Sequence, residues 1–151
     1  MSIFSGMNVS ATGMTAQRFR MDVISENIAN VNTTRDENGN VYRRKTVAFS
    51  EKNGLNFGDT LYNSLNVYKP NGVRVSRVVE DPSDLKMVYD PTHPDADENG
   101  YVSYPNVDTV TEMTNLIDAS RAYEANATAF NAAKAIAVKG CLLYTSPSPR
   151  D

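Results

Sequence analysis

Features that mark membrane proteins and secreted precursors are missing from this 151-residue chain. No stretch approaches the ~20 consecutive apolar residues of a membrane-spanning helix, and residues 1–13 lack the basic start and apolar run of a cleaved signal peptide. Taken alone, this predicts a cytoplasmic protein, unless export reads an uncleaved N-terminus. Cys141 is the one cysteine, which excludes an intrachain disulfide and leaves the redox compartment open.

The residues of common catalytic and binding sites are also scarce. His93 is the one histidine and has no second histidine or cysteine beside it, so it makes a weak metal ligand and a weak general base. Neither a glycine-rich phosphate loop nor a Gly-x-Ser-x-Gly elbow occurs. The net charge is −3 and the lysines and arginines are scattered, which argues against nucleic-acid binding. We expect neither an enzyme nor a cofactor.

What the chain does have is a repeated apolar spacing at both ends, in alternating steps of three and four residues. The N-terminal stripe consists of Ile3, Met7, Met14, Met21, Ile24 and Ile28, and the C-terminal stripe of Met113, Leu116, Tyr123, Ala127 and Phe130. This spacing places side chains on one side of an α-helix, close to the seam of a coiled coil. Periodicity alone leaves two possibilities open: helices that pack within one chain, and helices that pack against other copies.

The pattern divides the chain into four parts. Residues 1–33 and 108–139 are predicted to be long helices, the second capped by Asp108 or Thr109 and rich in alanine. Residues 34–107 contain five prolines and short candidate strands at residues 41–42, 46–49, 73–79 and 85–89, which predict a small β-rich insert with long loops. The expected fold class is therefore α+β, with the two helices forming a coiled-coil-like helical domain. Residues 140–151 break the pattern: Gly140 is expected to stop the helix, and we interpret the segment as a disordered, non-native tail.

One loop offers an alternative function. Asp95, Asp97 and Asn99 precede Gly100 with the spacing of the first half of a calcium-binding loop. The twelfth position, however, is Asn106 where such a loop needs a bidentate glutamate. Asp and Asn before Gly are also ordinary turn residues. A calcium-dependent binding module therefore remains the second hypothesis.

Three separated blocks resemble one known family. The residues Ser2-Ile-Phe-Ser5, Ser10-Ala-Thr-Gly-Met-Thr-Ala-Gln17 and Asn27-Ile-Ala-Asn-Val-Asn-Thr33 resemble the N-terminal signature of bacterial flagellar rod and hook proteins. The segment Tyr89-Asp-Pro-Thr-His-Pro-Asp-Ala-Asp-Glu-Asn-Gly-Tyr101 resembles, more specifically, the C-type proximal rod subunits. The helix Met113-Thr-Asn-Leu-Ile-Asp-Ala-Ser-Arg-Ala-Tyr-Glu-Ala-Asn126 fits the same family.

The resemblance implies a structural subunit of the basal-body rod, exported uncleaved by the flagellar type III apparatus into the periplasm. Such subunits polymerise into the drive shaft that carries torque to the hook. The implied partners are other copies, other rod subunits, basal-body ring and rod-base proteins, and the export apparatus. The signature further implies assembly roles for Asn27, Asn30 and Asn32. The segment after Lys139 departs from the family pattern.

Overall fold

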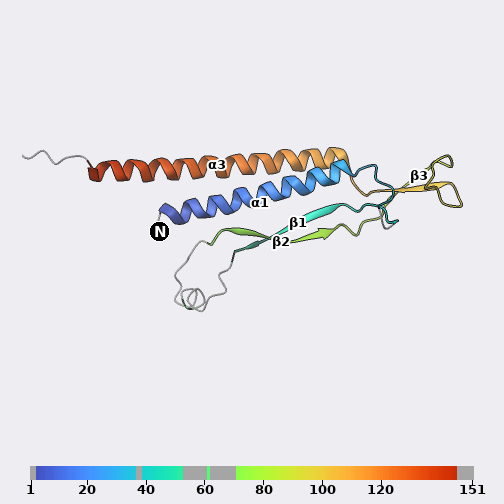
Figure 1. The fold of residues 1–151 in the computed structure, drawn as a ribbon, viewed down its shortest axis with the longest axis horizontal. Helices are drawn as coiled ribbons and strands as arrows, with labels where there is room; N and C mark the ends of the chain where they lie inside the picture. The colour runs from blue at the N-terminus through green and yellow to red at the C-terminus, as the bar shows by residue number, and fades with distance from the viewer. Residues whose placement is uncertain (1–2, 37–38, 53–60, 62–70, 146–151) are drawn as a thin grey trace, which may run out of the picture.

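The computed structural model describes residues 3–36, 39–52, 61 and 71–145 (Figure 1). A long helix lies near each end of the chain, and two small antiparallel sheets lie between the helices in sequence. The elements are α1 (Ile3–Ala29), β1 (Lys45–Glu51), β2 (Val73–Glu80), β3 (Lys86–Tyr89), β4 (Tyr101–Tyr104) and α3 (Thr109–Thr145). The α+β class with a β-rich middle is therefore confirmed.

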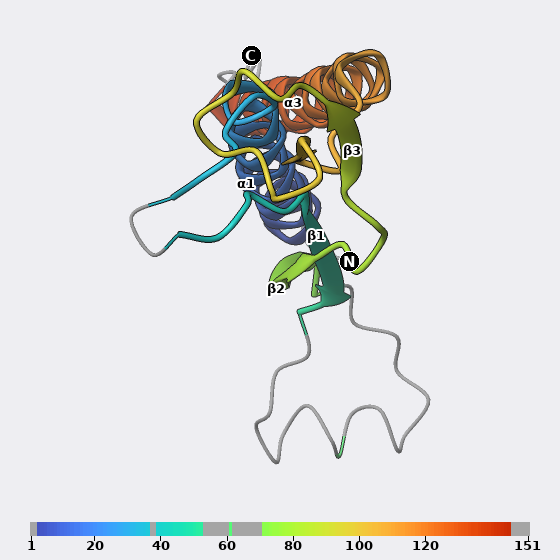
Figure 2. The same cartoon turned by 90° about the vertical axis from the view of Figure 1, so that its right-hand side faces the viewer.

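Helix α1 forms the central layer of the molecule. Figures 1 and 2 show α3 running antiparallel along one side of α1, with the β1–β2 ribbon on the opposite side. Both sides of α1 accordingly carry contacts: the position of Gly13 lies against Asn126 of α3, whereas the Thr12 hydroxyl accepts a hydrogen bond from the Val73 amide of β2 at 3.2 Å. Because α1 is covered on two sides, its buried residues are not confined to one apolar stripe.

The two sheets are separate antiparallel hairpins. β1 pairs with β2 from Lys45 opposite Glu80 to Glu51 opposite Val73, with a bulge between Ala48 and Phe49. β3 pairs with β4. Tyr89 lies opposite Tyr101, and the two rings contact edge to face with their centroids 5.3 Å apart.

The sequence expectations for the strands were met only in part. The sequence pattern did not predict β4, because Tyr101–Tyr104 lie inside the segment that resembles a calcium-binding loop. The pair Val41-Tyr42, expected as a strand, forms none, since the Tyr42 hydroxyl turns to α1 and bonds Asn27 instead.

Helix α3 begins as expected and ends later than expected. Asp108 caps it by accepting bonds from the Thr111 hydroxyl (2.5 Å) and amide (3.2 Å), and these bonds lower the pKa of the Asp108 carboxyl. The expectation that Gly140 stops the helix was wrong, because α3 continues to Thr145. A glycine inside a helix costs only about 1 kcal/mol, and the following residues, Cys141 to Tyr144, contain neither glycine nor proline to break it. Residues 146–151 lie outside the described part of the chain.

Candidate assembly interface and its polar junction

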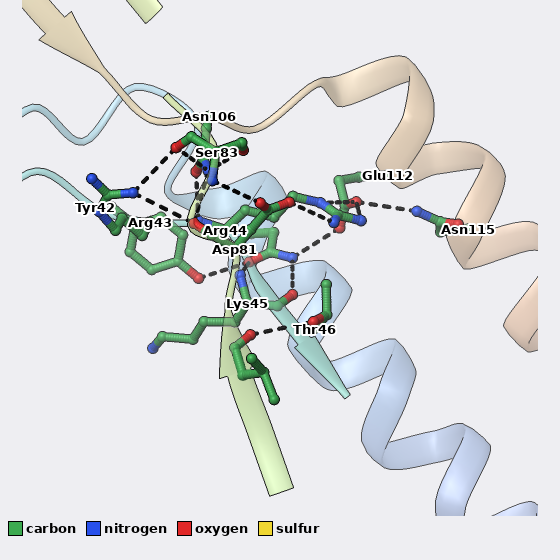
Figure 3. A network of polar contacts seen from close by, with 12 residues as sticks. Tyr42, Arg43, Arg44, Lys45, Thr46, Asp81, Ser83, Asn106, Glu112 and Asn115 are labelled. Atoms are coloured by element: carbon green, nitrogen blue, oxygen red, sulfur yellow. Dashed lines mark hydrogen bonds and ion pairs between the residues drawn. The ribbon is translucent and has the colours of Figure 1, made fainter. Parts of the chain in front are cut away.

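The helices and the β-rich middle meet at one buried acid. The Glu112 side chain is 1% exposed. Its Oε1 atom accepts hydrogen bonds from Arg44 Nη2 at 2.7 Å, Arg44 Nε at 3.0 Å and Asn115 Nδ2 at 3.1 Å. Figure 3 shows this fork reaching from the loop before β1 to the first turns of α3. Two hydrogen bonds from one guanidinium fix both the distance and the orientation of the pair.

Asn27 connects α1 to the same group and is completely buried. Its Nδ2 donates to Glu112 Oε2 at 2.9 Å and to the Lys45 carbonyl at 2.8 Å. Its Oδ1 accepts from the Tyr42 hydroxyl and from the Lys45 amide, both at 2.9 Å. All four hydrogen-bonding positions of the amide are thus used, which is what burial of a polar side chain requires.

A second layer of contacts holds Arg44 from the other side. Asn106 Oδ1 accepts from the Arg44 amide at 2.8 Å, and Asn106 Nδ2 donates to the Ser83 hydroxyl at 2.8 Å. Arg44 Nη1 lies 3.3 Å from Asp81 Oδ2. We call Asn27, Tyr42, Arg44, Asn106 and Glu112 the polar junction. It joins α1, the segment before β1, the segment between β4 and α3, and α3 at one end of the helix pair, and Asn106 also holds the loop before β3 through Ser83.

The junction changes the acidity of its members. Burial, together with the charges of Glu26, Glu112 and Glu80, raises the pKa of Tyr42 to about 12. Burial acts to lower the pKa of Arg44, but the hydrogen bond and charge of Glu112 outweigh it and raise that pKa. Arg44 therefore stays charged at every pH of interest, and Glu112 has a permanent cation beside it.

We predict that Tyr42 contributes a pH-dependent part of the stability. Because its folded-state pKa lies above the value of about 10 in an unfolded chain, this contribution is complete below pH ~10 and is lost as the pH rises to about 12. Urea unfolding from pH 8 upward should show parent and Tyr42→Phe chains converging above pH ~10. Tyr123→Phe, at an exposed position, is the control; a constant difference between parent and Tyr42→Phe would contradict the prediction.

The predicted interface residues lie at different depths in the single chain. Asn27 and Ile24 are buried, whereas Met113 is 52% exposed and Tyr123 36% exposed. Asn32 is exposed, and the side chain of Ile3 lies outside the described residues. The remaining predicted residues are half-buried: Met7, Met14, Met21, Ile28, Asn30, Leu116, Ala127 and Phe130. The predicted stripes therefore contain both covered and uncovered positions.

Small residues outside the predicted stripes are also covered in the folded chain. A Cβ atom built at Gly13 would lie 2.6 Å from Asn126 Oδ1, well inside contact distance. Ala16 of α1 and Ala119 of α3 are 3% and 0% exposed. Side chains of this size let two helix backbones come close, and a larger side chain at Gly13 has no room.

The acidic side chains of the possible calcium-binding loop bind other groups of the protein. Asp97 Oδ1 accepts bonds from the Asn99 amide at 2.9 Å and the Tyr101 amide at 2.8 Å, which fold the turn before β4. Asp95 instead accepts a bond from the Thr34 hydroxyl and lies 3.5 Å from an Arg35 nitrogen. Within the described residues, no group of three histidine, cysteine or acidic side chains is placed to hold a metal. The calcium hypothesis therefore has no structural support.

Sequence reasoning missed most of the polar junction. Nothing in the sequence pattern connects Glu112, in the first turn of α3, with Arg44. Asn27 and Glu112 are 85 residues apart, and Arg44 and Glu112 are 68 apart. The one available signal for the junction was Asn27, because it belongs to the N-terminal signature of the family that the sequence resembles.

These features define a class of protein. Two paired helices carry uncovered apolar side chains, a polar junction fastens them to a small β-rich middle, and the described residues include no helix long and apolar enough to cross a membrane. Such a chain is built to associate with other chains.

Comparison with known proteins specifies the family. Residues 7–35 match the family model of flagella basal body rod proteins, and residues 98–137 match the C-terminal model of the flagellar basal body rod FlgEFG proteins. The chain is 48% identical to flagellar basal-body rod protein FlgC of Bacillus subtilis, over 92% of this chain and 96% of the relative. It is 47% identical to FlgC of Borreliella burgdorferi, over 90% and 93%. The chain belongs to the flagellar basal-body rod protein family, and its function is that of a structural subunit of the rod.

Proposed function

We propose that this chain polymerises through its terminal helices, with copies of itself and with other rod subunits, into the drive shaft that transmits torque to the hook. In this proposal α1 and α3 first pair within one subunit and then pack laterally against neighbouring helices. The subunit has no catalytic role, and basal-body ring and rod-base proteins contact the polymer at its ends.

The observation that carries the proposal is the apolar surface left on the helix pair. Side chains with more than a third of their surface exposed include Phe4 and Phe19 of α1 and Val110, Met113, Ile117, Tyr123, Ile136, Val138 and Leu142 of α3. Val110, Met113 and Ile117 follow each other at steps of three and four, so they share one side of α3. A row of this kind is typical of a surface that another helix covers.

Membership of the family also suggests a location and an export route. We place the chain in the periplasmic part of the basal body and propose that the flagellar type III apparatus exports it without cleaving a signal peptide. Pairing of the helices would then be completed outside the export channel.

The last twelve residues are proposed to be foreign to the rod protein. The C-terminal family match ends at residue 137, although α3 itself runs on to Thr145. Resequencing the 3′ end of the gene tests this point directly, and recovery of the same twelve residues in the native gene would refute it.

The polymerisation proposal is tested by Met113→Asp. Met113 is half exposed, so the change should alter the stability of the isolated subunit by no more than about 0.5 kcal/mol. Placed against a neighbouring helix, however, the new charge would be buried without a partner, and incorporation into purified basal bodies should fall at least several-fold. Met113→Leu keeps an apolar side chain and should assemble normally. Normal incorporation of a folded Met113→Asp chain would count against the proposal.

A further inference from the structure

Two contacts define how α1 and α3 are aligned. Gly13 lies against Asn126, and Asn27 bonds Glu112 at 2.9 Å. Asn27 follows Gly13 by fourteen residues in α1, and Glu112 precedes Asn126 by fourteen residues in α3. Both contacts therefore belong to one antiparallel register, with the second held by the polar junction (Figure 3).

The remainder of the helix–helix contact selects this register weakly. Met7, Met14 and Met21 repeat every seven residues, and α3 carries nine alanines between Ala119 and Ala137. If α3 moved by one heptad, about 10.5 Å along the axis, small or apolar residues would again face each other. Gly13 would then lie opposite Ala133, a side chain smaller than Asn126. Such repeated patterns tolerate slippage unless something opposes it.

The polar junction opposes it strongly. In the shifted register Asn27 would lie opposite Ala119 rather than Glu112. The buried amide would then lose a partner, and Glu112 would move away from Arg44 or pull the segment before β1 with it. A buried polar group without a partner is among the costliest defects in a protein interior. Only one alignment satisfies all three side chains.

We infer that Asn27, Arg44 and Glu112 are the residues that determine the register of the helix pair, while apolar and small-residue packing supplies its stability without selecting the alignment. A polar group at one position of a helix seam, selecting register among otherwise similar alignments, is the best-attested use of buried polarity. The inference concerns the single subunit and so goes beyond polymerisation. Its relevance to the rod rests on the proposed function, because there many identical α1 and α3 helices would lie side by side and could pair out of register.

Disulfide trapping in the isolated full-length chain tests the inference without any flagellum. In a Cys141→Ser background, Gly13→Cys with Asn126→Cys reports the observed register. Gly13→Cys with Ala133→Cys, in an Asn126→Ala background that makes room for the new side chain at Gly13, reports the alignment shifted by one heptad. Mild oxidation followed by mass spectrometry of peptides gives the rate of each cross-link. With the native junction, the first pair should cross-link quickly and the second slowly.

The junction is then replaced by apolar side chains of similar size, with Asn27→Leu, Arg44→Met and Glu112→Leu together. The shifted pair should now cross-link at least about tenfold faster, while helix content by circular dichroism stays the same. Asn27→Ala alone is the second variant, for use if the triple variant does not fold. It removes the α1 side of the junction but leaves Glu112 with Arg44, and it should raise the shifted cross-link by a smaller factor.

Removal of charges outside the junction is the matched control. Arg121→Met with Glu124→Leu replaces one base and one acid at exposed positions of α3 and should leave the shifted cross-link at its native rate. If a folded triple variant, or folded Asn27→Ala, keeps the shifted cross-link at its native rate, the inference is wrong. The cross-linking experiment uses the isolated chain and does not depend on assembly into rods. Failure of the polymerisation proposal would therefore leave the conclusion about register unchanged.

Discussion

Glu112→Ala is expected to lower the free energy of unfolding by about 3–5 kcal/mol, a large part of the roughly 5–15 kcal/mol by which a domain is typically stable. The change removes the acceptor for two Arg44 donors and for the amides of Asn27 and Asn115. Arg44 would remain charged and partly buried beside Asp81 alone. The cost arises mainly from this uncompensated charge, not from the attraction that is lost. Urea unfolding followed by circular dichroism measures it.

Two variants separate this explanation from a simple loss of helix stability. Glu124→Ala removes an exposed acid from the same helix and should change the unfolding free energy by no more than about 0.5 kcal/mol. Arg44→Met added to Glu112→Ala removes the stranded charge and should recover part of the loss. If the double variant were less stable than Glu112→Ala by the full cost of a second defect, burial of the unpaired charge would not be the cause.

Gly13→Leu is expected to be the most damaging substitution on the α1 surface that faces α3. The new Cβ would lie 2.6 Å from Asn126 Oδ1, and Asn126 is itself held by a 2.8 Å hydrogen bond to the Ala122 carbonyl. The neighbour cannot move aside without breaking that bond, so the helices must separate. We expect a loss of about 1–3 kcal/mol in the isolated chain and failure of the paired helices to pack in the rod. Thermal unfolding and counts of basal bodies provide the two measurements.

Gly6 supplies the matched control for Gly13. It lies in the same helix, but nothing comes within 4 Å of a Cβ built there. Gly6→Leu should therefore stabilise the isolated helix pair slightly, since leucine is the better helix former by roughly 1 kcal/mol. The two changes should thus have opposite signs. Asn126→Ala should partly rescue Gly13→Leu by opening space, and an equal effect of both glycine substitutions would contradict the close-contact explanation.

Local pattern was enough to predict the helices and three of the described strands. Heptad spacing predicted α1 and α3, Asp108 marked the start of α3, and short apolar or alternating segments predicted β1, β2 and β3. These features depend on neighbours within a few residues, so they are visible in the sequence. The end of α3 was missed because a lone glycine weakens a helix without necessarily ending it.

The contact surfaces could not be predicted in the same way. Hydrophobic spacing selects methionines and isoleucines, whereas the covered positions also include Gly13, Ala16 and Ala119, which such spacing undervalues. α1 is also covered on two sides, and one predicted stripe describes only one of them. The polar junction joins residues from α1, from the segment before β1 and from the start of α3, and no spacing rule connects Asn27 or Arg44 to Glu112.

The position of the junction has a mechanical consequence for a rotating shaft. The bonds that tie α1 and the β-rich middle to α3 gather where α1 ends and α3 begins, and they run in several directions from one carboxylate. In the proposed drive shaft, torsional load passing from the helices to the β-rich middle would therefore be shared among several bonds instead of being taken by one. The contact network that specifies alignment would then also act as a torque coupling.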